Sequence, residues 1–100
     1  MANTPKVLFR GAATTGSATL YTTPAATTTV VTNIVVSNTA SAAATFDLLL
    51  DGVAICEDVA IAANSVAFFD LKQVLVATDL IAGFASAVTV NFHISGVEIS

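Results

Sequence analysis

The sequence predicts an all-β protein: an antiparallel β-sandwich of seven to eight short strands, for which a jelly roll is one arrangement. Three observations favour this fold class. Short runs alternate in polarity, β-branched residues are enriched, and small residues interrupt the runs at short intervals. One hundred residues correspond to a single domain, residues 1–100, with residues 1–10 as an N-terminal arm.

The first part of the chain contains the clearest strand. Residues 6–10 form a short first strand or arm, residues 11–16 form a loop, and residues 17–22 form a second strand. The second strand ends before Pro24, because proline cannot donate a hydrogen bond to a ladder. Thr28 to Asn38 is the next strand, with one face made of Val30, Thr32, Ile34 and Val36 and the other of Val31, Asn33, Val35 and Ser37.

Residues 46–55 are predicted to form a hairpin around Asp51-Gly52, a pair that favours a type I′ turn. This turn gives three cross-strand pairs: Leu50 with Val53, Leu48 with Ile55, and Phe46 with Glu57. Those residues, except Glu57, then share the core face. The opposite face carries Asp47, Leu49, Ala54 and Cys56. A register slipped by one residue would expose Phe46, Leu48 and Leu50 instead, so we favour a partner that covers this strip.

Further strands follow at short intervals. Residues 65–71 form a strand with apolar residues on both faces, residues 71–76 fit a short helical turn, and residues 80–85 form another strand. Two Ala-rich stretches, residues 40–44 and 60–63, lack the helical spacing of large apolar residues and are predicted to be loops.

Residues 88–99 form the final strand. Val88, Val90, Phe92 and Ile94 point one way, but after Gly96 the apolar residues change phase. A one-residue change of phase at a glycine predicts a β-bulge.

Composition narrows the function classes. Only 10% of the residues are charged and 55% are hydrophobic, whereas soluble domains are about 25% charged. This excludes an intrinsically disordered chain. Three Lys and Arg against seven Asp and Glu argue against a nucleic-acid partner. The excess of apolar residues predicts contacts with other copies or partners.

We expect neither a membrane span nor an export signal. The longest stretch without charge, residues 11–46, is rich in Thr, Ala, Ser and Asn and contains Pro24. The apolar run at residues 7–9 is too short for a signal peptide. A single cysteine cannot form an internal disulfide, which fits synthesis in a reducing cytoplasm.

Groups able to do chemistry are few. His93 and Cys56 are the single histidine and cysteine, but nothing in the sequence brings them together as a catalytic pair. The acidic residues around the hairpin lack the spacing of a calcium loop. Nucleotide-binding and hydrolase motifs are absent from the sequence. We therefore expect no enzyme, no cofactor and no metal site.

Two regions are candidate contacts with partners or other subunits. The first is the N-terminal segment, where two cations flank apolar residues: Lys6, Leu8, Phe9 and Arg10. The same pattern also suits an ordinary edge strand whose charges limit aggregation. The second is the apolar strip on the outward face of the hairpin: Leu49, Ala54 and Cys56.

Several blocks resemble a known group of proteins: LYTTPA at residues 20–25, TTTVVTNIVVSN at 27–38, FDLLLDG at 46–52 and NFHISGVEI at 91–99. Over most of residues 18–99 the chain resembles small β-sandwich virion proteins of tailed bacteriophages. The resemblance implies a structural role in capsid decoration (cement) or in a tail or fibre. It also implies homo-oligomers, often trimers, and no enzymatic activity.

The sequence thus favours a capsid decoration protein that binds and stabilises the major capsid protein shell. It would be made in the host bacterial cytoplasm and located in the virion, without nucleic-acid or membrane partners. The alternative is a tail-associated or receptor-binding module, although a single Tyr and no Trp offer little for stacking on sugars. An enzyme is the third class.

Overall fold

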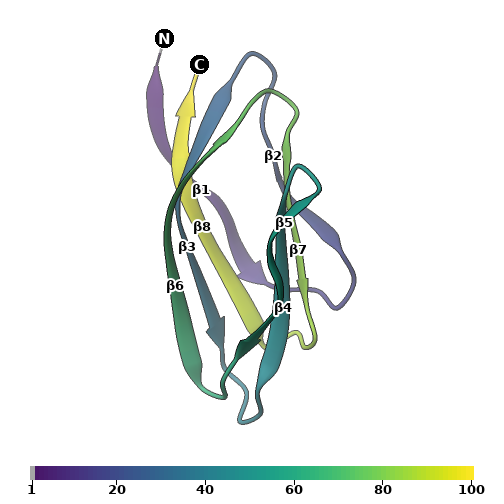
Figure 1. Cartoon of the computed structure of the whole chain (residues 1–100). Coiled ribbons are helices and arrows are strands. Elements are labelled where there is room, and N and C mark those ends of the chain that lie inside the picture. The colour runs from purple at the N-terminus through teal and green to yellow at the C-terminus, as the bar shows by residue number, and fades with distance from the viewer. Residues whose placement is uncertain (1) are drawn as a thin grey trace.

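The computed structural model describes residues 2–100, which fold into eight strands in two antiparallel sheets (Figure 1). The strands are β1 (Asn3–Ala12), β2 (Ala18–Thr22), β3 (Thr28–Asn38), β4 (Ala44–Leu50), β5 (Val53–Ile61), β6 (Ser65–Leu75), β7 (Leu80–Ala85) and β8 (Val90–Ile99). The first sheet has the order β1-β8-β3-β6 and the second β2-β7-β4-β5. This is the strand order of a jelly roll, so the predicted all-β sandwich is confirmed.

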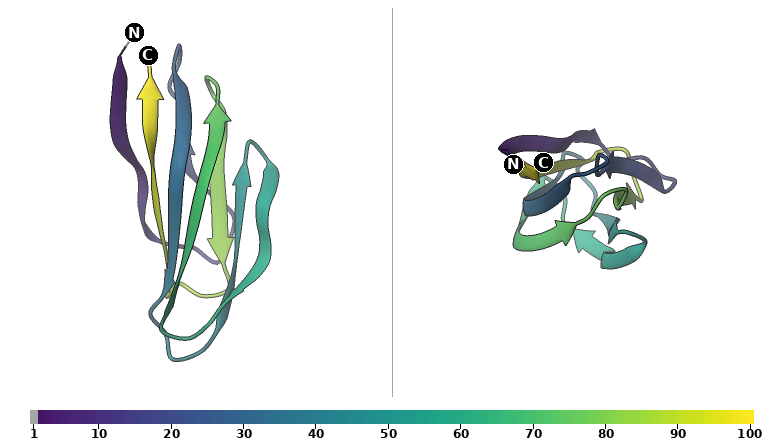
Figure 2. Two further views of the ribbon diagram at one scale, coloured as in Figure 1. Left: turned by 60° about the vertical axis from the view of Figure 1, so that its left-hand side comes forward. Right: turned by 90° about the horizontal axis from the view of Figure 1, so that it is seen from above.

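The molecule is elongated, with principal extents of 45 × 21 × 18 Å. The strands run along the long axis, and the two ends of the described chain lie side by side (Figure 2). The backbone N–H of Ala2 donates to the Ser100 carbonyl at 2.8 Å, and the N–H of Ser100 donates to the Ala2 carbonyl at 3.0 Å. The first and last strands, β1 and β8, are antiparallel neighbours along their whole length.

The core fills the space between the sheets. Alternate residues of β4, β7 and β8 face inward, which is the period-two pattern of a half-buried strand. Phe46 from the second sheet lies at its centre, with its ring edge-on to Phe69 and to Phe92 at centroid distances of 6.1 Å. These aromatic contacts join the two sheets.

The strand bounds agree with several sequence predictions. The strands at residues 28–38 and 80–85 are confirmed. The type I′ turn is also confirmed, since Asp51 and Gly52 both have positive φ values of 51° and 79°.

Two other local predictions are wrong. Residues 71–76 do not form a helical turn, because β6 continues to Leu75 and pairs with Thr29 of β3. Residues 60 and 61, expected in a loop, belong to β5. In both places, hydrogen bonds to a neighbouring strand make the strand longer than the spacing of its own residues predicts.

The predicted irregularity near Gly96 exists, but the extra residues lie in the two neighbouring strands. The register shifts at Leu8 in β1 and at Thr32 in β3, both next to the Gly96 level. A Cβ on Gly96 would collide with the carbonyl oxygen of Val30, so the close approach of β3 requires glycine here. The expected change of phase within the last strand is therefore wrong.

The bulge also corrects the predicted faces of β3. Thr29 and Val31 are buried before the bulge, and Ile34 and Val36 are buried after it. Val30 and Ile34 thus lie on opposite faces, although an uninterrupted period of two places them together. The inward set changes from odd to even residues because Thr32 is the extra residue.

The hairpin register differs from the prediction beyond its first pair. Leu50 pairs with Val53, as expected, but Leu48 pairs with Cys56 and Phe46 with Val59. Register shifts in β5 account for the difference, and Asp58 has a positive φ of 47° there. As a result Ile55, expected in the core, is exposed, whereas Cys56 is buried. Val53, also expected in the core, is exposed although its pairing with Leu50 is the predicted one.

Candidate assembly surface

The free edge of the first sheet carries the most exposed large hydrophobic side chain of the described residues. β6 pairs with β3 on one side and has no strand on its other side in residues 2–100. Phe68 is 76% exposed, Val66 is 51% exposed and Val74 is 62% exposed. A monomeric soluble domain rarely leaves a contiguous set of large apolar side chains in water.

From Ser65 to Lys72, half-buried and exposed residues of β6 alternate, so the two faces of the strand have different environments. Ala67, Phe69 and Leu71 point inward and pack against the core. Asp70 and Lys72 lie on the outward face together with the exposed apolar residues. The outward face of this edge is therefore apolar at both ends and charged in the middle.

A pocket of about 380 Å³ opens between β5 and β6. Ile55 and Cys56 line it from β5, and Phe68, Phe69 and Leu71 line it from β6. Ile34, a core residue that is almost fully buried, forms part of the wall. Asp70 and Gln73 of β6 add polar groups to the lining. The seam between the two sheets is thus open on this side of the sandwich.

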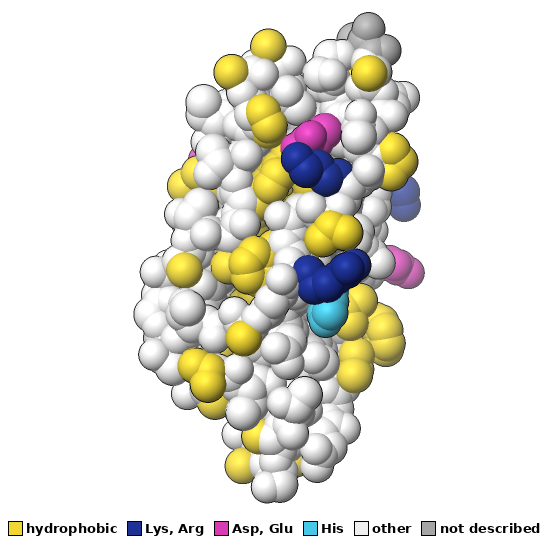
Figure 3. Space-filling view, turned by 180° about the vertical axis from the view of Figure 1, so that it is seen from behind, with side chains coloured by type: hydrophobic (Ala, Val, Ile, Leu, Met, Phe, Trp, Pro, Cys, Tyr) yellow, Lys and Arg dark blue, Asp and Glu magenta, His cyan; other side chains and the backbone are white. Residues whose placement is uncertain are grey.

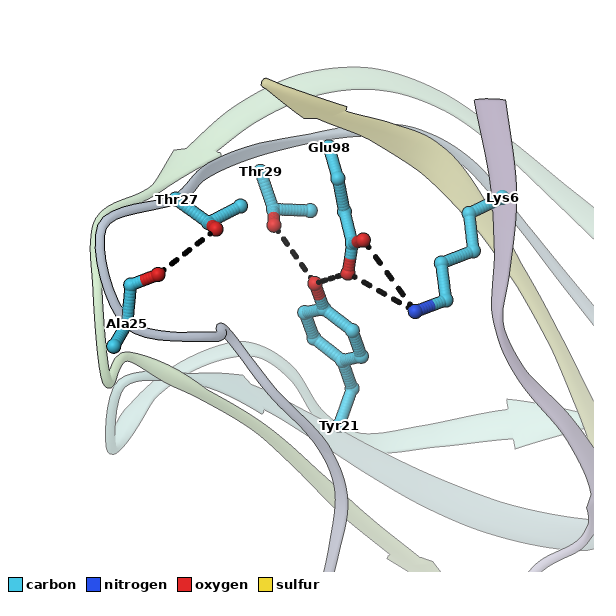
Figure 4. A network of polar contacts seen from close by, with 6 residues as sticks. All are labelled: Lys6, Tyr21, Ala25, Thr27, Thr29 and Glu98. Carbon is cyan, nitrogen blue, oxygen red and sulfur yellow. Dashed lines mark hydrogen bonds and ion pairs between the residues drawn. The ribbon is translucent and has the colours of Figure 1, made fainter. Parts of the chain in front are cut away.

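The opposite side is closed by a polar network that joins the sheets (Figure 4). Tyr21 of β2 donates its hydroxyl hydrogen to Glu98 Oε2 of β8 at 2.5 Å, and its oxygen lies 2.8 Å from Thr29 Oγ1 of β3. A phenol has one hydrogen, so Thr29 is the donor in the second bond. Lys6 Nζ of β1 donates to both Glu98 oxygens at 3.3 and 3.4 Å.

The network shifts the acidities of its members. Burial, followed by the hydrogen bond to Glu98, raises the pKa of Tyr21 to about 12. The hydrogen bond from Tyr21 lowers the pKa of Glu98 below its usual 4.5, and Lys6 acts in the same direction. The network therefore holds a neutral phenol and an ionised carboxylate.

The candidate residues of the N-terminal segment divide between surface and core. Lys6 and Arg10 are exposed, but Lys6 is already paired with Glu98. Leu8, the bulge residue of β1, is buried in the core, and Phe9 packs partly against it. Of the four, Arg10 is therefore the exposed residue that forms no ion pair within residues 2–100.

The outward strip of the hairpin is present but shorter than expected. Leu49 and Ala54 are cross-strand partners, with Leu49 half-buried and Ala54 exposed, and Leu49 also pairs with Ala82 of β7. Cys56 instead faces the core, so its predicted outward orientation is wrong. Burial, followed by the nearby Asp47 carboxylate, raises the pKa of the Cys56 thiol, which makes it a poor nucleophile.

The residues considered for chemistry are separated by the sandwich. His93 lies on β8 of the first sheet, with Arg10 and Val35 as its cross-strand neighbours, whereas Cys56 lies on β5 of the second. Residues 2–100 contain no group of three or more His, Cys, Asp or Glu placed to hold a metal ion. The same described range has no helix that is long and apolar enough to cross a membrane.

These sites can be recognised only in part from the sequence. Apolar residues on both faces of residues 65–71 signalled that one face lacks cover, and this is the exposed edge of β6. The Tyr21 network was missed, because its four members are far apart in the chain. The one available signal was Glu98, a charged residue between Val97 and Ile99.

Comparisons with known proteins give a general likeness. No protein-family model and no curated protein matches this chain. Two crystal structures of a pentameric capsid protein isolated from metagenomic phage sequences, one solved by iodide SAD phasing, are 21% identical to it, with TM-scores of 0.43 and 0.44. Each covers 90% of this chain, which spans 58% and 59% of their lengths.

Proposed function

We propose that the chain is a non-enzymatic structural protein of a phage particle, which decorates the capsid and connects neighbouring major capsid subunits. Its action is non-covalent: apolar surface is buried against the shell at about 25 cal/mol per Å². The protein acts as a homo-oligomer, is located in the virion and is made in the host cytoplasm. The rival role is a tail or fibre component.

The observation that carries this proposal is the amount of exposed apolar surface. Among residues 2–100, eight large hydrophobic residues are exposed: Val7, Val53, Ile55, Val66, Phe68, Val74, Val76 and Val88. Figure 3 views the molecule from behind, where hydrophobic side chains lie between uncharged ones and charged side chains are in the minority. A surface of this kind is typical of proteins that bury it in an assembly and is uncommon on monomeric soluble proteins.

Two further points support the choice of a virion. Jelly rolls are frequent in viral capsid and lectin domains, although a fold does not by itself give a function. The blocks at residues 20–38, 46–52 and 91–99 resemble phage virion proteins of the same architecture. Neither the resemblance nor the surface calls for a catalytic group.

The proposed shell contact combines the outer face of the second sheet with the exposed part of β1. Leu49 and Ala54 supply an apolar pair on the outer face. Arg10 and the partly buried Phe9 supply the contact on β1, together with Lys6. Leu8 and Cys56 leave the proposed set because both are buried.

Cryo-electron microscopy of the particle tests the location, and we expect density for this chain on the outer shell. Density on the tail alone would replace decoration with the rival role. In a binding assay on undecorated shells, Ala54→Asp should reduce the bound copies at least tenfold, because it places a charge in the apolar contact. Ala60→Asp, on an exposed position of the same strand, is the matched control and should bind normally. Equal binding by both variants would remove Leu49 and Ala54 from the contact.

A further inference from the structure

The outward residues of β6 are self-complementary when the strand is read in both directions. Two pairs lie at equal distances on either side of Leu71, Asp70 with Lys72 and Phe68 with Val74. Val66 has its counterpart in Val76, just beyond the end of β6. The innermost pair has opposite charges, and the two outer pairs are apolar. All six residues are exposed in the single chain.

An antiparallel pair of identical strands uses this kind of pattern. In such a pair the two-fold axis lies between the two copies of one residue, and each residue before it faces the equivalent residue after it on the other copy. With the axis at Leu71, Asp70 faces the partner's Lys72, and Phe68 faces the partner's Val74. Directly opposed side chains in an antiparallel pair are close enough to interact.

The outer edge of β6 is available for this pairing. Inward and outward residues alternate from Ser65 to Lys72, β6 has one extra residue relative to β3 between Asp70 and Gln73, and it is among the longest strands of the protein at 11 residues. Its outer edge carries no strand in the part of the chain that the structure describes. A free edge presents unpaired N–H and carbonyl groups to an added strand.

We propose that two copies of this chain associate through β6, antiparallel and with the two-fold axis at Leu71, to form a continuous eight-stranded sheet. The pairing covers Phe68. It also forms two equivalent ion pairs, one on each side of the axis, each between Asp70 of one copy and Lys72 of the other. It is a property of the isolated protein and does not depend on shell binding. It also gives a dimer, whereas the phage resemblance implies trimers.

Charges on an edge strand have another common use, which is to prevent pairing. That role is served by charges of one sign, since two copies then repel. Here the two signs stand two residues apart, so that each meets its opposite in the self-paired strand. The arrangement therefore favours the pairing of two copies of β6 in one register, and it does not act as a charge barrier against pairing.

Sedimentation equilibrium of the purified full chain and three charge variants tests the proposal. The wild type should be a dimer. Asp70→Lys and Lys72→Asp each create two like-charge contacts per dimer, and each should raise the dissociation constant about tenfold to a hundredfold. The double variant with both changes restores opposite charges and should dimerise like the wild type. Glu57→Lys, on the exposed surface of β5, is the matched control and should leave the dimer unchanged.

Each outcome decides the matter. Loss in both single variants and recovery in the double variant supports the β6 pairing, and the recovery also rules out a folding defect. A wild-type monomer, a trimer, or single variants that dimerise normally would overturn it. If Asp70→Asn increases association, the charges act as a barrier and the proposal is wrong. None of these results depends on shell binding, which the Ala54→Asp experiment tests separately.

Discussion

The two long sides of the sandwich differ in how the sheets meet. On the β1/β2 side, Tyr21 crosses from the second sheet to Glu98 and Thr29 of the first, and Lys6 completes the network. On the β5/β6 side a pocket separates the sheets, and large apolar residues stand in solvent. One side is closed by polar groups that satisfy each other, and the other is left open.

The difference separates stability from assembly. The buried phenol of Tyr21, the buried hydroxyl of Thr29 and the partly buried carboxylate of Glu98 stabilise the fold only when all are hydrogen-bonded. Substitutions on the closed side are therefore expected to destabilise the protein. Exposed apolar residues on the open side contribute little to the folding free energy of one chain. They contribute to the free energy of association when a partner covers them. Variants on the two sides should therefore fail in different assays.

The largest effect is expected next to the closed side, at Gly96. Gly96→Ala places a Cβ against the Val30 carbonyl oxygen and near Leu8, and the surrounding backbone has to move. We expect a loss of about 3 kcal/mol of unfolding free energy, measured by urea denaturation. Gly16→Ala is the matched control, since no atom lies within 4 Å of its Cβ position. Equal stability of the two variants would show that the strands are not held close at Gly96.

Removal of the Tyr21 hydroxyl should come next. Tyr21→Phe leaves Thr29 and one side of Glu98 without their partner on the closed side. The expected cost is about 1–3 kcal/mol in the same denaturation experiment. Thr32→Val removes a hydroxyl that bonds the Ser95 carbonyl at the exposed surface and should cost less. A Tyr21→Phe variant as stable as the wild type would mean that the network does not hold this side together.

The acid response of the closed side should be smaller but specific. The pKa of Glu98 is lower in the folded protein than its usual 4.5, so the folded state binds this proton less readily than the unfolded state. The stabilisation is therefore present above about pH 4.5 and is lost as the pH falls through the folded pKa. Urea midpoints measured across this range should fall less steeply for Glu98→Gln than for the wild type. Parallel profiles would contradict the assignment to Glu98.

The smallest effect is expected on the open side. Val53 is exposed at the start of β5, and Val53→Thr keeps the β-branched shape. We expect the unfolding free energy to change by no more than about 0.5 kcal/mol. Thermal denaturation at a low protein concentration, where a dimer dissociates, measures it. A loss comparable to that of Tyr21→Phe would remove the contrast between the two sides.

Features set by neighbouring residues could be predicted from the sequence. Asp51-Gly52 fixes its own turn because both residues tolerate positive φ, and the clear alternation of β7 fixes its face. Pro24 follows the end of β2 as expected. These predictions depend on residues that are close together in the sequence, so the sequence pattern is sufficient to make them.

Features set by distant strands could not be predicted in the same way. Thr32 and Leu8 become extra residues because β8 approaches both neighbours closely at Gly96, a contact across more than 60 positions of the chain. The bulges of β5 turn Cys56 inward in the same manner. Each bulge reverses the faces beyond it, so one unseen residue moves a candidate site from surface to core.

The bonds between Ala2 and Ser100 have a mechanical consequence. The two ends lie at the same end of the molecule, on antiparallel strands that are hydrogen-bonded to each other. Because ladder bonds run perpendicular to the strands, a pull that separates the ends loads these bonds one after another, as in a zipper, and not all together in shear. A force applied through the faces of the sheets would not pull β1 and β8 apart in this way. The place where the protein is attached should therefore determine how much force it withstands.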